Sequence, residues 1–169
     1  MARRLTVPLL FMLLLGLVVA ALVAADTNYT CPDNSCAFTV PDSYTEASND
    51  ATQIIFQDPA SGGVFSVAVT DGSAYASLDD AVNNLDSQNV AKDSYQAGPN
   101  NRQNTIVAGN PATLLEYTAN NSNGLLVETA NFISIYQGKL YQLIFVTTPD
   151  QEDAFVANAK PVFDSWQFT

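Results

Sequence analysis

The stretch ATLLEYTANNSNGLLVETANFISIYQGKLYQLIFVT, residues 112–147, decides the fold. It holds three runs rich in β-branched and aromatic residues, separated by two short polar turns. The first turn ends in Asn123-Gly124, a dipeptide typical of tight hairpins, and Gln137-Gly138 makes the second. The pattern predicts an antiparallel meander with strands over 112–118, 125–136 and 140–147.

The last strand of this meander is apolar on both of its faces. Successive side chains of a strand point to opposite sides, and here one set is Tyr141, Leu143 and Phe145 and the other is Leu140, Ile144 and Val146. A strand of this kind is covered on both sides. We therefore expect an α+β fold, an antiparallel β-sheet with helices on both faces arranged as an α/β/α sandwich.

Upstream of the meander, the pattern predicts further strands and one helix. Strands are expected over 37–40, 52–57, 64–70 and 105–107, with 52–70 forming a hairpin across the Gly-rich loop 58–63. Ser77 followed by Asp80 resembles a capping box, and apolar residues then recur at helical spacing, which predicts a helix over about residues 78–91. The polar stretch 97–104 is expected to be a loop.

A second helix is expected after the meander. Thr148 is placed to cap it, Pro149 suits its first position, and Gln151 completes a capping box. Pro161 lacks an N–H, so we expect it to bend or end the helix near Lys160. Trp166 and Phe168 are expected to plug the core.

The first 25 residues have the form of an export signal. Arg3 and Arg4 precede an apolar run from Leu5 to Val23, and small residues follow up to Ala25. We expect cleavage after Ala25. The run is also close to membrane-spanning length, so an uncleaved N-terminal anchor is the alternative, and it is the one expected contact with a membrane. Both alternatives place the protein outside the cytoplasm, secreted or anchored.

The two cysteines, Cys31 and Cys36, follow this segment with four residues between them. Exported proteins meet oxidising surroundings, so we expect a disulfide. The predicted organisation is a signal peptide over 1–25, a disulfide-stapled segment over 26–36 and a single domain over 37–169.

Charge limits the partners of this domain. The chain has a formal net charge of −11, and residues 26–169 carry −13 because Arg3 and Arg4 lie in the signal. Nucleic-acid binding depends on neutralising phosphates with Lys and Arg. We therefore expect no nucleic-acid partner. The field favours cations and basic partners, and the alternative is that the charge serves only to keep an exported protein soluble or to suit a salty habitat.

The sequence contains no histidine, which removes the usual general base and the commonest transition-metal ligand. We expect no catalytic residue and no cofactor. Glu116 and Glu128 flank one predicted turn as possible cross-strand neighbours, and they are the weak candidates for a metal site. Paired carboxylates also permit hydrolase chemistry when they face each other across a cleft.

Five segments resemble one family in the same order: CAFTVPDSY (36–44), SLDDAVNNL (77–85), IVAGNPATLLEYTAN (106–120), GKLYQLIFVTTPD (138–150) and VFDSWQF (162–168). The chain resembles the PsbP-like proteins, whose superfamily includes the Ran-binding Mog proteins. The resemblance implies an α/β/α sandwich and a non-enzymatic role. Plant members help retain calcium and chloride at photosystem II, and many bacterial relatives are exported.

The chain departs from that family at two points. Tyr44 stands where many members carry Trp, and histidine-based metal sites have no counterpart here. We therefore transfer the fold and not the photosystem role. The sequence predicts a non-catalytic exported accessory domain with an unknown protein partner. The first alternative is a weak Ca²⁺- or Mn²⁺-binding protein outside the cytoplasm. A carboxylate-based hydrolase is the second and less favoured alternative.

Overall fold

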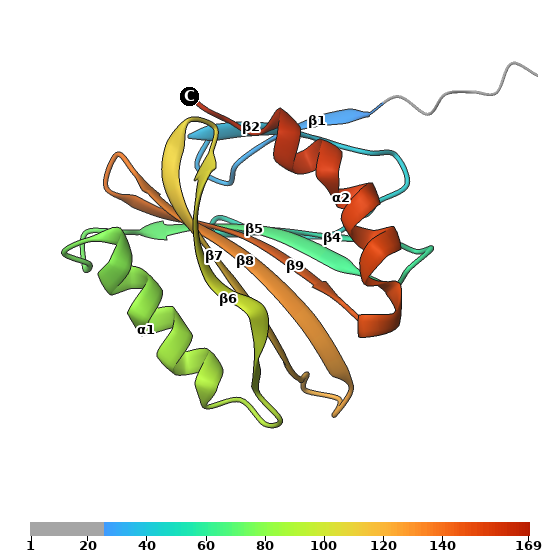
Figure 1. Cartoon of the computed structure of the whole chain (residues 1–169). Helices are drawn as coiled ribbons and strands as arrows, with labels where there is room; N and C mark the ends of the chain where they lie inside the picture. The colour runs from blue at the N-terminus through green and yellow to red at the C-terminus, as the bar shows by residue number, and fades with distance from the viewer. Residues whose placement is uncertain (1–25) are drawn as a thin grey trace, which may run out of the picture.

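A central sheet of seven strands organises the computed structural model, which describes residues 26–169 (Figure 1). The predicted signal segment and its cleavage point lie outside the described residues. Neighbouring strands of the sheet are antiparallel in the order β3-β4-β5-β9-β8-β7-β6. The strands are β3 (Thr45–Asn49), β4 (Gln53–Gln57), β5 (Val64–Asp71), β6 (Gln96–Val107), β7 (Asn110–Asn120), β8 (Leu126–Tyr136) and β9 (Lys139–Thr147).

Two helices lie on opposite faces of this sheet. Helix α1 (Leu78–Val90) covers one face, and α2 (Glu152–Ser165), preceded by the 3-10 turn η1 (Pro149–Gln151), covers the other (Figure 1). A small sheet in the order β1-β2-β10 lies on the α2 side and consists of β1 (Thr27–Thr30), β2 (Cys36–Val40) and β10 (Gln167–Phe168). This arrangement confirms the predicted α+β sandwich. Among residues 26–169, no helix combines the length and apolar character that crossing a membrane requires.

The predicted meander is β7, β8 and β9. Its register runs from Ala112 opposite Ser134 to Asn120 opposite Leu126, and β9 continues it on the other side of β8. Gly124 and Gly138 adopt φ angles of 74° and 77°, which side chains other than glycine rarely allow, so these two turns are fixed where the sequence placed them.

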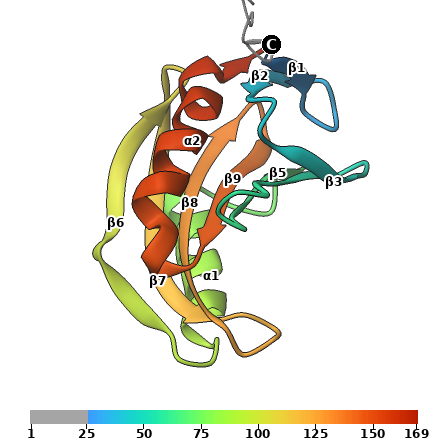
Figure 2. The same ribbon diagram turned by 90° about the vertical axis from the view of Figure 1, so that its right-hand side faces the viewer.

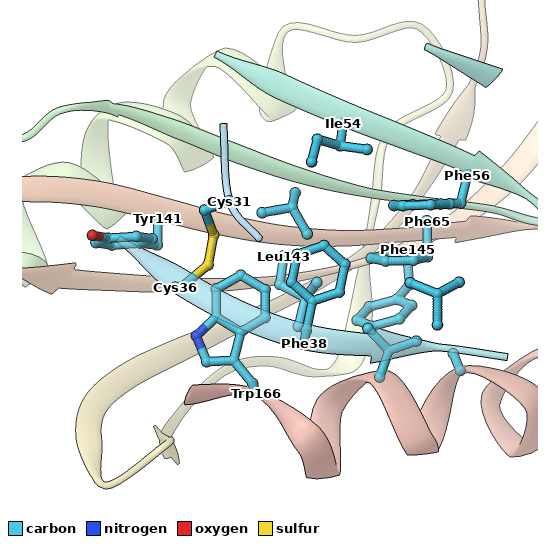
Figure 3. Packing of buried hydrophobic residues seen from close by; sticks show 14 of the residues in the cluster. Cys31, Cys36, Phe38, Ile54, Phe56, Phe65, Tyr141, Leu143, Phe145 and Trp166 are labelled. Carbon is cyan, nitrogen blue, oxygen red and sulfur yellow. A yellow bond between two sulfur atoms is a disulfide. The ribbon is translucent and has the colours of Figure 1, made fainter. Parts of the chain in front are cut away.

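The larger core fills the space between the sheet, β2 and α2. Phe38 of β2 lies against Trp166 and Phe65 (Figure 3). It stacks on Trp166 at a centroid distance of 5.3 Å and meets Phe65 edge-on at 6.0 Å. Phe56 stacks on Phe65 at 4.8 Å. Trp166 is buried, which confirms its predicted role as a core plug, whereas Phe168 is half-buried at the edge. These contacts hold the small sheet and α2 on one face.

Both ends of the described chain meet at β2. The Cys31–Cys36 disulfide closes the β1–β2 hairpin with a Cα–Cα distance of 5.1 Å, and both cysteines are buried. β10 pairs with the other edge of β2, at Ala37 and Cys36. The predicted disulfide therefore staples the strand that receives the C-terminus.

Residues 97–104 form part of strand β6, so the prediction of a loop was wrong. The polar residues and Gly98-Pro99 are typical of a loop, but here they form a strand whose pairing with β7 shifts register between Ala97 and Arg102. The backbone of this segment forms its hydrogen bonds with β7, although its polar side chains are not typical of a strand. The short strands β1, β3 and β10 were also missed, because each is a strand only through its pairing with a neighbouring strand.

Helix α2 does not end near Lys160, the second of the two outcomes expected for Pro161, since it continues through Pro161 to Ser165. Pro161 and Ala157, whose carbonyl loses its intrahelical partner, both lie on the exposed side of the helix where water reaches the backbone.

Thr148 precedes η1 without a side-chain capping bond, so the predicted capping box is absent. At α1 the prediction holds, because Ser77 Oγ accepts from the N–H of Asp80 at 3.1 Å.

One buried carboxylate ties the β4–β5 turn to α2. Asp58 is fully buried and accepts hydrogen bonds from Ala60 N at 2.9 Å, Ser61 Oγ at 2.8 Å and Asn158 Nδ2 at 3.2 Å. Burial alone raises the pKa of Asp58, but these hydrogen bonds outweigh it and hold the pKa below its ordinary value.

We predict that Asp58→Ala lowers the free energy of unfolding by about 2–4 kcal/mol at neutral pH, because it removes a buried carboxylate together with its three hydrogen bonds. A lowered folded-state pKa gives stability that is present above the unfolded value of 3.8 and is lost as pH falls through the folded value. Denaturant melts at neutral and acid pH measure both effects. Asp50→Ala is the control, since exposed Asp50 makes a similar turn. An equal loss in both variants would contradict this role for Asp58.

Candidate functional site

A groove of about 410 Å³ lies between α2 and the sheet. Figure 2 shows α2 running along β8 and β9, with β6 and β7 curving away beyond it. The groove is lined by Glu116, Ala130, Phe132, Phe145, Phe155, Val156, Ala159, Lys160, Phe163 and Asp164. Its surface is therefore mainly aromatic and aliphatic, with charges at its margins.

The aromatic lining follows from the alternation of the strands and the spacing of α2. Phe132 and Phe145 point to the α2 side from β8 and β9 and meet edge-on at 5.9 Å. The ring centroid of Phe163, on α2, lies 4.7 Å from the ring centroid of Phe132. Val156 is 57% exposed on the same helix, so the groove opens to solvent along one side. Packed aromatic rings therefore line the groove, and helix α2 does not cover it completely.

Glu116 lies at one end of this groove, on β7, where it is half-buried. The register shift in β6 brings Gly98 so close that a Cβ there would lie 2.9 Å from the Cβ of Glu116. Glycine at this position lets β6 fold against Glu116. The carboxylate is therefore partly removed from water by its own neighbouring strand.

Glu128 and Glu152 complete a cluster of three carboxylates. In the β7–β8 register, Glu116 is opposite Ala130 and Glu128 is opposite Thr118, so the two glutamates are diagonal neighbours on the same face. Glu152 begins α2 above them and interacts with both. We call the whole feature, the groove with Glu116, Glu128 and Glu152, the acid-rimmed groove.

These carboxylates are not neutralised within the cluster. Burial, followed by the charge of Glu152, raises the pKa of Glu116. Burial raises the pKa of Glu128 as well, and the charges of Glu152 and Glu116 add to it. Lys160, the cation that lines the groove, forms an ion pair with Asp164 one turn along α2. The acid-rimmed groove thus combines an apolar surface with unbalanced negative charge.

Glu116 and Glu128, expected as cross-strand neighbours, lie on adjacent strands in diagonal positions. It missed Glu152 and the groove, because only the docking of α2 brings that helix over β8. Among residues 26–169, no three Cys, Asp or Glu side chains are close enough together to hold a metal ion. The groove also offers few hydrogen-bonding side chains that would hold a sugar for carboxylate catalysis.

The chain is similar in structure to several proteins of the expected fold. It matches cyanobacterial PsbP from Synechocystis sp. PCC 6803 with a TM-score of 0.60 at 16% identity, over 92% of this chain and 99% of that one. It matches LpqN of Mycobacterium tuberculosis, described as involved in cell envelope biogenesis, with a TM-score of 0.59 at 15% identity, over 86% and 91%. A point mutant of the protein Mog1 gives 0.56 at 11% identity, over 85% and 96%.

These similarities show the fold alone, which is the PsbP-like fold that the sequence motifs predicted. A longer Bacteroides thetaiotaomicron protein also matches with a TM-score of 0.60, and the chain spans about half (48%) of its length. No protein-family model matches the sequence, and no curated protein matches it significantly.

We predict that the double variant Glu116→Gln/Glu128→Gln is more stable than the wild type at neutral pH. A carboxyl whose pKa is raised on folding costs stability above its folded pKa and costs nothing below its unfolded value of 4.5. Relief of like-charge repulsion should raise Tm by about 1–3 °C. Thermal melts at neutral pH and well below 4.5 test this. A gain that persists unchanged in acid would rule out ionisation as its cause.

Proposed function

We propose that this PsbP-like fold serves outside the cytoplasm as a non-catalytic accessory domain that binds a protein partner through the acid-rimmed groove. The observation that carries the proposal is the pairing of an open aromatic groove with carboxylates that lack cationic partners among residues 26–169. Exposed apolar surface of this kind marks interaction sites on soluble domains.

The groove also defines the chemistry of the partner. Phe132, Val156 and Phe163 offer contact area to an aliphatic or aromatic side chain. Glu116 and the neighbouring carboxylates favour an ammonium or guanidinium group next to it. A partner segment that combines Lys or Arg with Leu or Phe on one face satisfies both parts of the groove. The net charge of −13 over residues 26–169 steers such a segment toward the domain.

Three features support a place outside the cytoplasm. The first 25 residues have the composition of an export signal, the described part contains a disulfide, and LpqN of similar structure is described as involved in cell envelope biogenesis. Each feature agrees with the others, and together they favour export over residence in the reducing cytoplasm.

We predict that a fluorescent peptide with Leu and Lys at helical spacing binds the purified chain, and that Val156→Asp weakens this binding at least about tenfold, or 1.4 kcal/mol. The added charge faces the apolar groove and must be desolvated when the peptide binds. Fluorescence anisotropy gives the Kd. Raising the salt concentration should also weaken binding of the peptide to the wild type, because part of the attraction is electrostatic.

Val90→Asp is the matched control, since Val90 on α1 is also 57% exposed but lies on the opposite side of the sheet. It should bind like the wild type. Equal binding of a peptide with Glu in place of Lys, or equal effects of the two substitutions, would contradict the proposal. A calcium-dependent rise in Tm that disappears in Glu116→Gln would assign the carboxylates to a cation instead. Substrate turnover abolished by that substitution would assign them to catalysis.

We also predict that a host with an export pathway releases a product that begins at Asp26. Mass spectrometry of the extracytoplasmic fraction measures its mass. Ala25→Phe should retain the full-length chain, because signal peptidase needs a small residue at this position. Recovery of the full-length wild-type chain in the membrane fraction, with its domain on the extracytoplasmic side, would support the anchored alternative. Retention of the wild type in the cytoplasm would overturn export.

A further inference from the structure

The apolar side chains between α1 and the sheet gather toward one end of the helix. The small core there consists of Ala81, Val82, Leu115, Ile133 and Leu140, all at the N-terminal half of the helix or on the strands beneath it. Beyond it, along the C-terminal half of α1, lies a hollow of about 510 Å³. This volume falls within the range of roughly 300–1,000 Å³ that is typical of small-molecule sites.

The lining of this α1 hollow is a mixture of amides, hydroxyls and aliphatic groups. It consists of Leu85, Gln88, Asn89, Lys92, Tyr117, Ala119, Asn120, Asn121, Ser122, Val127, Thr129, Asn131, Ile144 and Val146. It includes no carboxylate, although the domain is strongly acidic. The α1 hollow therefore differs in chemistry from the acid-rimmed groove on the other face of the sheet.

Asn131 is the residue that points to a ligand. It lies in the middle of β8, between Leu115 and Ile144 on the neighbouring strands, and is only 4% exposed. Its Nδ2 donates to Gln142 Oε1 at 3.0 Å, but its Oδ1 accepts no hydrogen bond from any residue in the described range. A buried acceptor without a partner costs stability, and an apolar residue would avoid this cost.

Further polar groups surround Asn131. Thr129 is 4% exposed and Asn89, on the inward face of α1, is 8% exposed. At the rim, Lys92 donates from Nζ to Tyr117 Oη at 2.7 Å and lies 4.7 Å from the centre of that ring. Inward polar residues of this kind do not build a core, and they occur where the apolar cluster ends.

We propose that the α1 hollow binds a small neutral polyhydroxylated molecule of the monosaccharide or disaccharide class. Val127, Ile144 and Val146 offer an apolar floor to the C–H face of a sugar ring. Amide side chains both donate and accept hydrogen bonds, which matches hydroxyl groups that do the same. Asn131 Oδ1 lies just beneath the lining of the hollow, and a turn of this side chain presents the oxygen to a ligand hydroxyl, the donor that the described residues do not supply.

This proposal is independent of the proposed function, because α1 and α2 lie on opposite faces of the sheet (Figure 1). A protein partner in the acid-rimmed groove leaves the α1 hollow open. Failure of either binding test therefore says nothing about the other.

The test is NMR titration of the purified chain with glucose, N-acetylglucosamine, cellobiose and maltose at millimolar concentrations. At least one of these sugars should shift the backbone amides of Asn89, Tyr117 and Asn131 together. Asn131→Leu should weaken that binding at least about tenfold and should leave the protein folded, because removing the unpaired oxygen offsets the loss of the one hydrogen bond to half-buried Gln142. Thr129→Val is the second variant and should also weaken binding.

Asn104→Leu is the matched control, because Asn104 is exposed on β6 and does not line the hollow. It should bind sugar like the wild type. The proposal is overturned if none of the four sugars shifts the three amides, or if Asn131→Leu and Thr129→Val both bind with unchanged affinity.

Discussion

The contact between Phe38 and its aromatic neighbours holds the two parts of the domain together. Phe38 stacks on Trp166 and meets Phe56 and Phe65 edge-on, so a strand near the N-terminus, the end of α2 and the central sheet share one buried centre. Large aromatic surfaces contribute most of the free energy of such a core. The position of α2, and with it the acid-rimmed groove, depends on this cluster.

The two faces of the sheet are covered in different ways, and this difference creates the two proposed sites. On the α2 side, aromatic packing is dense near Phe38 and thins toward Phe132 and Phe163, where the groove opens. On the α1 side, a short helix meets a wide sheet, and the apolar contact ends near Leu85. Each site lies where one helix stops filling its face.

Charge separates the two sites further. Glu116 and Glu128 repel each other and Glu152, which favours a cationic partner in the acid-rimmed groove. No carboxylate lines the α1 hollow, where neutral amides predominate. Asp86 on α1 and Asp93 just after it lie on this side of the sheet but outside the lining, so the surface that a ligand would contact is neutral apart from Lys92.

By itself the sequence determined the meander, helix α1, the disulfide and the two-sided burial of β9, because alternation, helical spacing and turn glycines act over a few residues. It could not show that 97–104 pairs with β7, since the partner of a polar strand is remote in sequence. It could not show that Pro161 lies within α2, because the exposure of the helix at that point decides whether a lost hydrogen bond matters. Glu152 joined Glu116 and Glu128, and Asn131 became buried, only when the helices docked on the sheet. Such contacts link residues far apart in the chain, so only the tertiary structure decides them.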